Sequence, residues 1–171
     1  MATLIGILPI GTVFSDSNPS FVDGILTIPE IDSAEKAGEF QEVILQFTDQ
    51  GELVLQDYKN GVQVQVIENV ELIKTESFPV QVLLRVTGYI SVCLELGQIS
   101  TRVLNNKFEV ILYYLNNARL LTPGGFGCVA AVNFFTEIIP LPVYALAAGE
   151  YEYDVNGDFT GIFSLLEDNE L

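Results

Sequence analysis

Residues 154–158, Asp-Val-Asn-Gly-Asp, place an acidic or amide oxygen at every second position. Asp154, Asn156 and Asp158 match the first three ligand positions of an EF-hand calcium loop. The sixth position is Phe159 instead of Gly and the twelfth is Leu165 instead of Glu, so the EF-hand pattern fails. A hairpin turn alone explains the Asn and the Gly. We therefore expect a turn and no metal here, and these three residues are the calcium candidates that the sequence offers.

The sequence contains no His, which limits the chemistry open to it. Ser-His-Asp and Cys-His nucleophilic sites are excluded, and so are His-based zinc, copper and iron sites. Cys93 and Cys128 are the only cysteines, and two cysteines cannot complete a tetrahedral zinc site. They form either one disulfide or two buried thiols. We expect no cofactor.

Carboxylates are abundant, with 23 acidic against 7 basic residues and a net charge of −16. Such a chain has no basic patch for nucleic acid, and an anionic membrane surface repels it. The excess of negative charge suits a cationic partner or a divalent cation. The alternative is that repulsion between these charges only keeps the protein surface soluble. An enzyme with two catalytic carboxylates, such as a glycosidase, is one alternative. No particular pair stands out in the sequence, and there is no Trp to stack on a sugar ring.

Alternation of β-branched and aromatic residues with polar ones predicts an all-β fold, and helix signals are nearly absent. The expected class is an antiparallel β-sandwich, with an Ig-like C-terminal part preceded by a β-meander. We expect a domain boundary near residue 75, giving 1–74 and 75–171; the alternative is one continuous sandwich. The expected strands are residues 24–31, 40–47, 52–59, 62–73, 80–96, 99–104, 108–115, 128–141 and 142–146, followed by a hairpin over 150–165, with a loop at 122–127.

The two Asn-Gly pairs predict different turns. At Asn60-Gly61 a two-residue turn, which would pair Lys59 with Val62, separates apolar from polar residues on the two faces. At Asn156-Gly157 the same turn would put phenylalanines on the face of Glu150 and Glu152. A loop over 156–158 instead pairs Val155 with Phe159, and also Tyr153 with Gly161 and Tyr151 with Phe163. We therefore predict an odd loop there.

No segment of the sequence is long enough to span a membrane, because the longest apolar run is broken by Pro140 and Pro142. The apolar start lacks the basic region of a signal peptide, since the first Lys is Lys36. We expect Met1 to be an addition that follows a removed signal.

The C-terminal part, residues 80 to 166, carries several motifs together. They are Cys93, "NNKFEVIL", Cys128 with "FFTEIIPLPVYAL", and the ending "AAGEYEYDVNGDFTGIFSL". This set resembles uncharacterised secreted or lipoprotein-type bacterial proteins with an Ig-like or fibronectin-like β-sandwich. The resemblance implies export to the periplasm, the cell envelope or the medium, a Cys93–Cys128 disulfide and a sandwich fold. It implies no activity.

We therefore expect a non-enzymatic module that binds a protein or a glycan. Tyr58, Tyr89, Tyr113 and Tyr114 could supply rigid contact area if they are exposed. The alternatives are the carboxylate enzyme described above and a structural or oligomerising domain whose exposed edge strand pairs with another chain.

Overall fold

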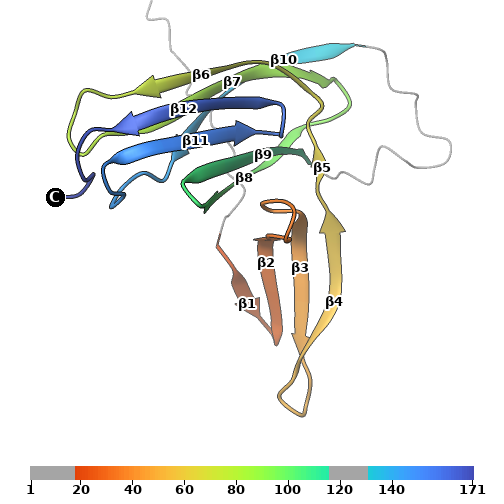
Figure 1. Ribbon diagram of the computed structural model, residues 1–171. Helices are drawn as coiled ribbons and strands as arrows, with labels where there is room; N and C mark the ends of the chain where they lie inside the picture. The colour runs from red at the N-terminus through yellow and green to blue at the C-terminus, as the bar shows by residue number, and fades with distance from the viewer. Residues whose placement is uncertain (1–17, 116–130) are drawn as a thin grey trace, which may run out of the picture.

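The computed structural model describes residues 18–115 and 131–171, which form strands, turns and loops without a helix. The strands form three sheets. Figure 1 shows that these sheets make up two distinct parts of the fold. Two of the sheets pack as a β-sandwich, and the third projects from it. The predicted all-β, largely antiparallel fold is confirmed.

One sheet of the sandwich has three strands in the order β10-β7-β6. The other has five, in the order β12-β11-β9-β5 with β8 also paired to β9. Every pairing is antiparallel except that of β9 with β11. The bounds are β5 (Val62–Gln63), β6 (Val66–Lys74), β7 (Val82–Ser91), β8 (Leu96–Leu104), β9 (Lys107–Tyr114), β10 (Val132–Leu141), β11 (Gly149–Val155) and β12 (Phe159–Leu165).

The core lies between these two sheets, because the inward residues of each alternate along its strands. The first sheet contributes Val82, Leu84 and Val86 of β7, and the second contributes Phe108, Val110 and Leu112 of β9. Tyr151, Phe108 and Phe163 add an aromatic cluster with ring centroids 5.6–6.1 Å apart. These large rings lie in the core and bury apolar surface between the two sheets.

The projecting sheet, called the arm below, has the strand order β1-β2-β3-β4 and is antiparallel throughout. Its strands are β1 (Ser20–Val22), β2 (Ile25–Ile31), β3 (Phe40–Phe47) and β4 (Leu53–Asn60). Asp23 and Gly24, both at positive φ, make the two-residue turn between β1 and β2. β1 lies outside the strand ranges expected from the sequence, although an Asp-Gly pair is typical of such a turn.

The predicted register of the C-terminal hairpin is confirmed. Val155 pairs with Phe159, Tyr153 with Gly161 and Tyr151 with Phe163, around a loop of residues 156–158. Asn156 and Gly157 both have positive φ, which suits these two residue types. The face pattern of the strands therefore identified the register correctly.

The predicted hairpin at Asn60-Gly61 is wrong. Lys59 pairs with Gln41 in the arm, whereas Val62 pairs with Tyr114 in the sandwich. The chain thus passes from β4 to β5 without reversing, as Figure 1 shows. Gly61 is needed for close approach instead of a turn, because a Cβ at this position would lie 2.5 Å from the Tyr113 ring.

The segment 62–73, expected as one strand, forms two strands, β5 and β6. β5 joins the five-stranded sheet, and β6 joins the three-stranded one. Both therefore pair within the sandwich, and the last strand of the arm ends at Asn60. No helix long and apolar enough to cross a membrane occurs in the described part of the chain.

Candidate functional site

One face of the arm carries apolar side chains on all of its strands. Cross-strand partners share a face, and the register aligns Phe21 with Leu26, Leu26 with Leu45, and Leu45 with Leu55. The apolar arm face consists of Phe21, Leu26, Ile28, Val43, Leu45, Phe47, Leu53 and Leu55. The opposite face mixes apolar residues with Thr27 and Gln46. The arm is a single layer, and none of the strands in residues 18–115 and 131–171 forms a second sheet over the apolar arm face (Figure 1).

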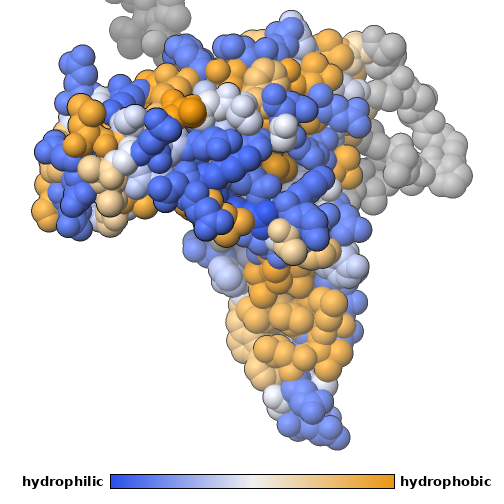
Figure 2. All heavy atoms as spheres, in the orientation of Figure 1, coloured by the Kyte–Doolittle hydropathy of each residue, from blue (hydrophilic) through white to orange (hydrophobic). Residues whose placement is uncertain are grey.

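Exposure of this face is large for a soluble protein. Phe21 is 59% exposed and Leu55 is 52% exposed, and Phe47 and Leu53 are also exposed, whereas Val43 near the sandwich is buried. Figure 2 shows apolar side chains gathered over the arm, between a hydrophilic tip and the sandwich. Contiguous apolar patches of this kind mark interaction surfaces.

Two of the edge strands, β4 and β10, are protected to different degrees. β10 contains Pro140 and turns Glu137 toward the interior, and burial raises the pKa of that carboxyl. A proline and an inward charge both discourage pairing with another chain. β4 pairs only with β3 among the described strands, and its segment Leu53-Val54-Leu55 has neither device. The arm therefore presents an open edge as well as an open face.

A set of polar contacts fixes the base of the arm to the outer face of β8 and β9; we call it the junction. The Tyr113 hydroxyl donates to the Ala37 carbonyl at 2.6 Å, and Arg102 Nη1 donates to the Ser33 carbonyl at 2.6 Å. The Ala37 amide donates to Glu109 Oε2 at 3.1 Å. The loop of residues 32–39 is thereby held against β9, so the arm has a defined orientation.

Glu30 and Asp32 bring two carboxylates into the junction. The pKa of Glu30 is raised above its usual value, mainly because the carboxyl is buried. A hydrogen bond from Ser100 lowers this pKa, and the nearby charge of Asp32 raises it. The Ser100 hydroxyl donates to Glu30, and the Gly38 amide donates to Asp32 Oδ1 at 2.7 Å. Both carboxylates thus bind groups of the protein, as expected of structural side chains.

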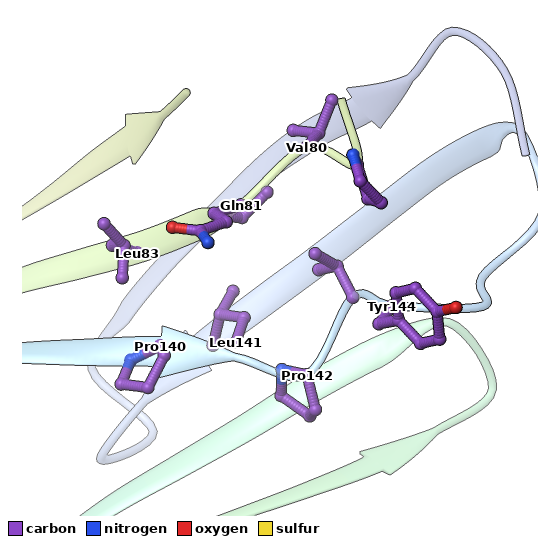
Figure 3. Close-up of a pocket in the computed structure, with 10 residues that line it drawn as sticks. Val80, Gln81, Leu83, Pro140, Leu141, Pro142 and Tyr144 are labelled. Carbon is purple, nitrogen blue, oxygen red and sulfur yellow. The ribbon is translucent and has the colours of Figure 1, made fainter. Parts of the chain in front are cut away.

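A shallow groove of about 410 Å³ lies at the ends of β7 and β10 (Figure 3). Proline and aliphatic side chains form most of its wall: Pro79, Val80, Val82, Leu83, Pro140, Leu141, Pro142 and Val143, with Gln81 and Tyr144. None of these lining residues is acidic or nucleophilic in the way that a hydrolytic site requires. The groove offers an apolar contact surface.

Two of the three candidate calcium ligands, Asp154 and Asn156, already have partners in the protein. Asp154 accepts from the Gly157 amide at 2.7 Å and pairs with Lys107 Nζ at 2.8 Å, which raises the pKa of Lys107. Asn156 is buried; its Oδ1 accepts from the Leu112 amide at 2.9 Å and its Nδ2 donates to the Val64 carbonyl at 2.8 Å. Asp158 is exposed in the turn. In residues 18–115 and 131–171, no three His, Cys, Asp or Glu side chains form a metal-binding group.

Cys93 follows β7 in a turn and is half-buried, and its amide donates to Ser91 Oγ at 3.3 Å. Cys128 and the loop expected at 122–127 lie outside the described residues. The Cys93–Cys128 disulfide therefore stays a prediction.

The four tyrosines considered for contact have different environments. Tyr58 is exposed on β4, beside Phe40, and half-buried Tyr89 lies against Phe134 on the outer face of β7 and β10. Tyr113 is 1% exposed and supplies no contact area, because it packs under the loop that carries Ala37. Tyr114 is half-buried, and its hydroxyl accepts from the Gln65 amide at 3.4 Å.

Sequence reasoning missed Asn169, which is fully buried near the groove. Its Nδ2 donates to the carbonyls of Val80 and Val143, each at 2.9 Å. No local pattern in the sequence identifies Asn169, because its partners Val80 and Val143 lie 89 and 26 residues away along the chain.

Comparisons with known proteins give one match. Neither the curated proteins nor the solved structures include a protein that matches this chain. A family model, the ORF11 beta-sandwich domain, matches residues 84–165, which run from β7 to the end of β12. These residues contribute most of the sandwich and none of the arm. The part of the chain from 84 to 165 is thus similar to the ORF11 beta-sandwich domain, a β-sandwich module.

Proposed function

We propose that this protein is a non-enzymatic binding module that attaches to a protein partner through the apolar arm face. The observation that carries the proposal is the exposure of that face on a sheet whose base is fixed by the junction. A sheet that is apolar on one face is stable when another element covers that face. In this chain the described strands leave it open.

The chemistry of the surface favours protein over glycan. A glycan site combines stacking with several side-chain hydrogen bonds to hydroxyl groups, and the apolar arm face has no polar side chain. Aliphatic and aromatic side chains instead match the apolar centre of a protein interface. Glu30 and Asp32 accept hydrogen bonds from Ser100 and Gly38, which supports a structural role for these carboxylates instead of a catalytic one.

We further propose that the protein acts outside the cytoplasm, in the cell envelope or in secreted form. The support is the resemblance of residues 80 to 166 to exported modules and the pair Cys93 and Cys128, which could form a disulfide in an oxidising compartment.

Site-specific photocrosslinking tests the binding proposal. A photoreactive residue replaces Leu55 on the arm or, as the matched control, Ile138 on the outer face of β10; the two are 52% and 49% exposed. In the cells that make the protein, we expect a crosslinked protein adduct from position 55 and much less from position 138. Equal adducts at both positions, or none at position 55, would contradict the proposal.

A further inference from the structure

We infer that the partner which covers the apolar arm face is a second copy of this chain, with the two arms packed face to face. This inference rests on the proposed function, because it names the occupant of the same surface. Two sheets packed in this way lie about 10 Å apart and form a sandwich of an ordinary kind.

The first support is chemical self-complementarity. The eight residues of the apolar arm face are all apolar, and the polar residues that continue this face, Glu30 and Gln41, lie at the base of the arm, where Glu30 bonds to Ser100 and Gln41 is buried. Two copies can therefore meet through the outer part of the face without burying a charge or an unpaired donor. A two-fold axis presents the same patch from both copies, which is the commonest arrangement of homodimers. A chain with a net charge of −16 meets its own copy best through an uncharged surface.

The second support is the area. Strands lie about 4.8 Å apart and rise about 3.4 Å per residue, so four strands of about five residues cover roughly 19 by 17 Å. Each face is thus a plane of about 320 Å² at most, since β1 is shorter, and its side chains add to this surface. Packing two faces therefore buries on the order of 700–1,000 Å² in total, at or below the lower limit of specific interfaces. The arm alone thus supports a weak dimer that forms at high protein concentration.

The third support is the position of the arm. It projects from the sandwich, so a second arm can approach its face beside the tip (Figure 1). Asp49 and Glu52 lie in the tip loop, close to Phe47 and Leu53 of the apolar arm face. Repulsion between the acidic copies opposes assembly, and salt screens it. Association should therefore strengthen as salt rises, which is opposite to the behaviour of an interface held by ion pairs.

Sedimentation velocity of the purified full chain tests the inference. From micromolar to sub-millimolar concentration we expect a monomer–dimer equilibrium that tightens at about 0.5 M NaCl, where screening acts within a few Å. Leu55→Asp should weaken the dimer at least about tenfold, because symmetry places the new charge in the interface twice. The matched variant Ile138→Asp adds the same charge to a similarly exposed strand position and should leave the dimer unchanged.

Melting temperatures of both variants show whether each remains folded. If Leu55→Asp does not fold, Phe21→Asp replaces it, because Phe21 lies on the short edge strand β1 and is 59% exposed. A chain that is monomeric at every concentration overturns the inference. Equal weakening by the arm variant and by Ile138→Asp overturns it as well.

The face that makes the contact is tested by neighbouring positions on β3, the strand inside the arm. Leu45 lies on the apolar arm face and Gln46 on the opposite face. A photoreactive residue at position 45 should give a crosslinked dimer, and one at position 46 should not. Crosslinking from 46 instead, or pairing of the β4 edges without crosslinking from 45, overturns face-to-face packing.

The two proposals fail separately. If the purified chain is monomeric while position 55 crosslinks to a different protein in cells, the second-copy inference is overturned and the proposed function stands. If neither experiment gives an adduct on the arm, both are overturned.

Discussion

Asn169 binds both backbone groups of Val80 with one carboxamide. Its Oδ1 accepts from the Val80 amide at 2.7 Å, and its Nδ2 donates to the Val80 carbonyl at 2.9 Å. The backbone of Asn169 bonds to Ala145 and Leu146 in addition. The C-terminal segment is thereby fixed across the end of the sandwich, beside the groove.

Removing that carboxamide should destabilise the protein strongly. In Asn169→Ala the amide and carbonyl of Val80 and the carbonyl of Val143 lose buried partners, and each unsatisfied group costs about 1–3 kcal/mol. Because the two bonds to Val80 are only partly buried, each lost group should cost close to the lower figure, and we expect the free energy of unfolding in urea to fall by about 3–5 kcal/mol in total. Glu170→Ala, at an exposed position of the same tail, is the control and should change it by less than about 0.5 kcal/mol. A similar loss in both variants would contradict the role of Asn169.

Glu30→Gln should stabilise the protein at neutral pH. Burial raises the pKa of Glu30 above its usual 4.5, so the folded state binds this proton more tightly than the unfolded chain does. The wild type therefore loses stability as the pH rises through the range just above 4.5. Gln keeps an oxygen that can accept from the Ser100 hydroxyl and carries no charge at any pH.

The measurement is the difference in melting temperature between Glu30→Gln and the wild type from about pH 4 to about pH 7. The difference should grow in favour of the variant as the pH rises. Glu35→Gln, which changes an exposed carboxylate in the adjoining loop, is the control and should show a smaller trend. A constant difference for Glu30→Gln would show that its ionisation does not affect folding.

Gly61→Ala should loosen the passage from the arm into the sandwich. The added Cβ would lie 2.5 Å from Tyr113 Cδ1 and 3.0 Å from Gln41 Nε2, so a buried ring must move. Overpacking of this kind costs about 1–3 kcal/mol of stability. At Gly149 the nearest atom to an added Cβ is 3.8 Å away, so Gly149→Ala is the matched control and should be tolerated in thermal melts.

Asn156 is expected to act through its fold contacts and not through calcium. Asn156→Gly keeps the positive φ and loses the bonds to Leu112 and Val64, and we expect a loss of about 2–3 kcal/mol. Asn156→Ala should lose more, because it also strains the turn. Adding millimolar calcium to the wild type should leave the melting temperature unchanged, since a ligand that binds the folded state would raise it.

A Cys93–Cys128 disulfide would close a loop of about 35 residues and stabilise the chain by roughly 3–4 kcal/mol. Thiol alkylation under denaturing conditions should therefore label no cysteine before reduction and both after it. Reduction should also lower the melting temperature. Labelling of both thiols without reductant would contradict the pairing.

Local patterns predicted the parts of the fold that local residues determine. The C-terminal hairpin is one such part, because only one register places Tyr151, Tyr153 and Val155 on the face of Phe163. Asn60-Gly61 shows the opposite case. Its turn propensity is real, yet Val62 pairs with Tyr114, and no feature near position 62 identifies so distant a partner.

The strands that carry the candidate surface could be predicted from the sequence, but the exposure of that surface could not. The sequence predicted strands over 24–31 and 40–47, and both strands are confirmed. Whether the apolar arm face is buried depends on packing between sheets, which strand alternation does not report. The exposure of the apolar arm face could therefore be found only in the structure.

The direct passage through Gly61, together with the junction, has a thermodynamic consequence for recognition. A surface on a flexible tether loses orientational freedom when it binds, and that loss weakens the complex. The arm has lost most of this freedom already on folding, because β4 leads straight into β5 and Tyr113 holds the facing loop. Even a contact of modest area on the arm can therefore retain much of its favourable free energy.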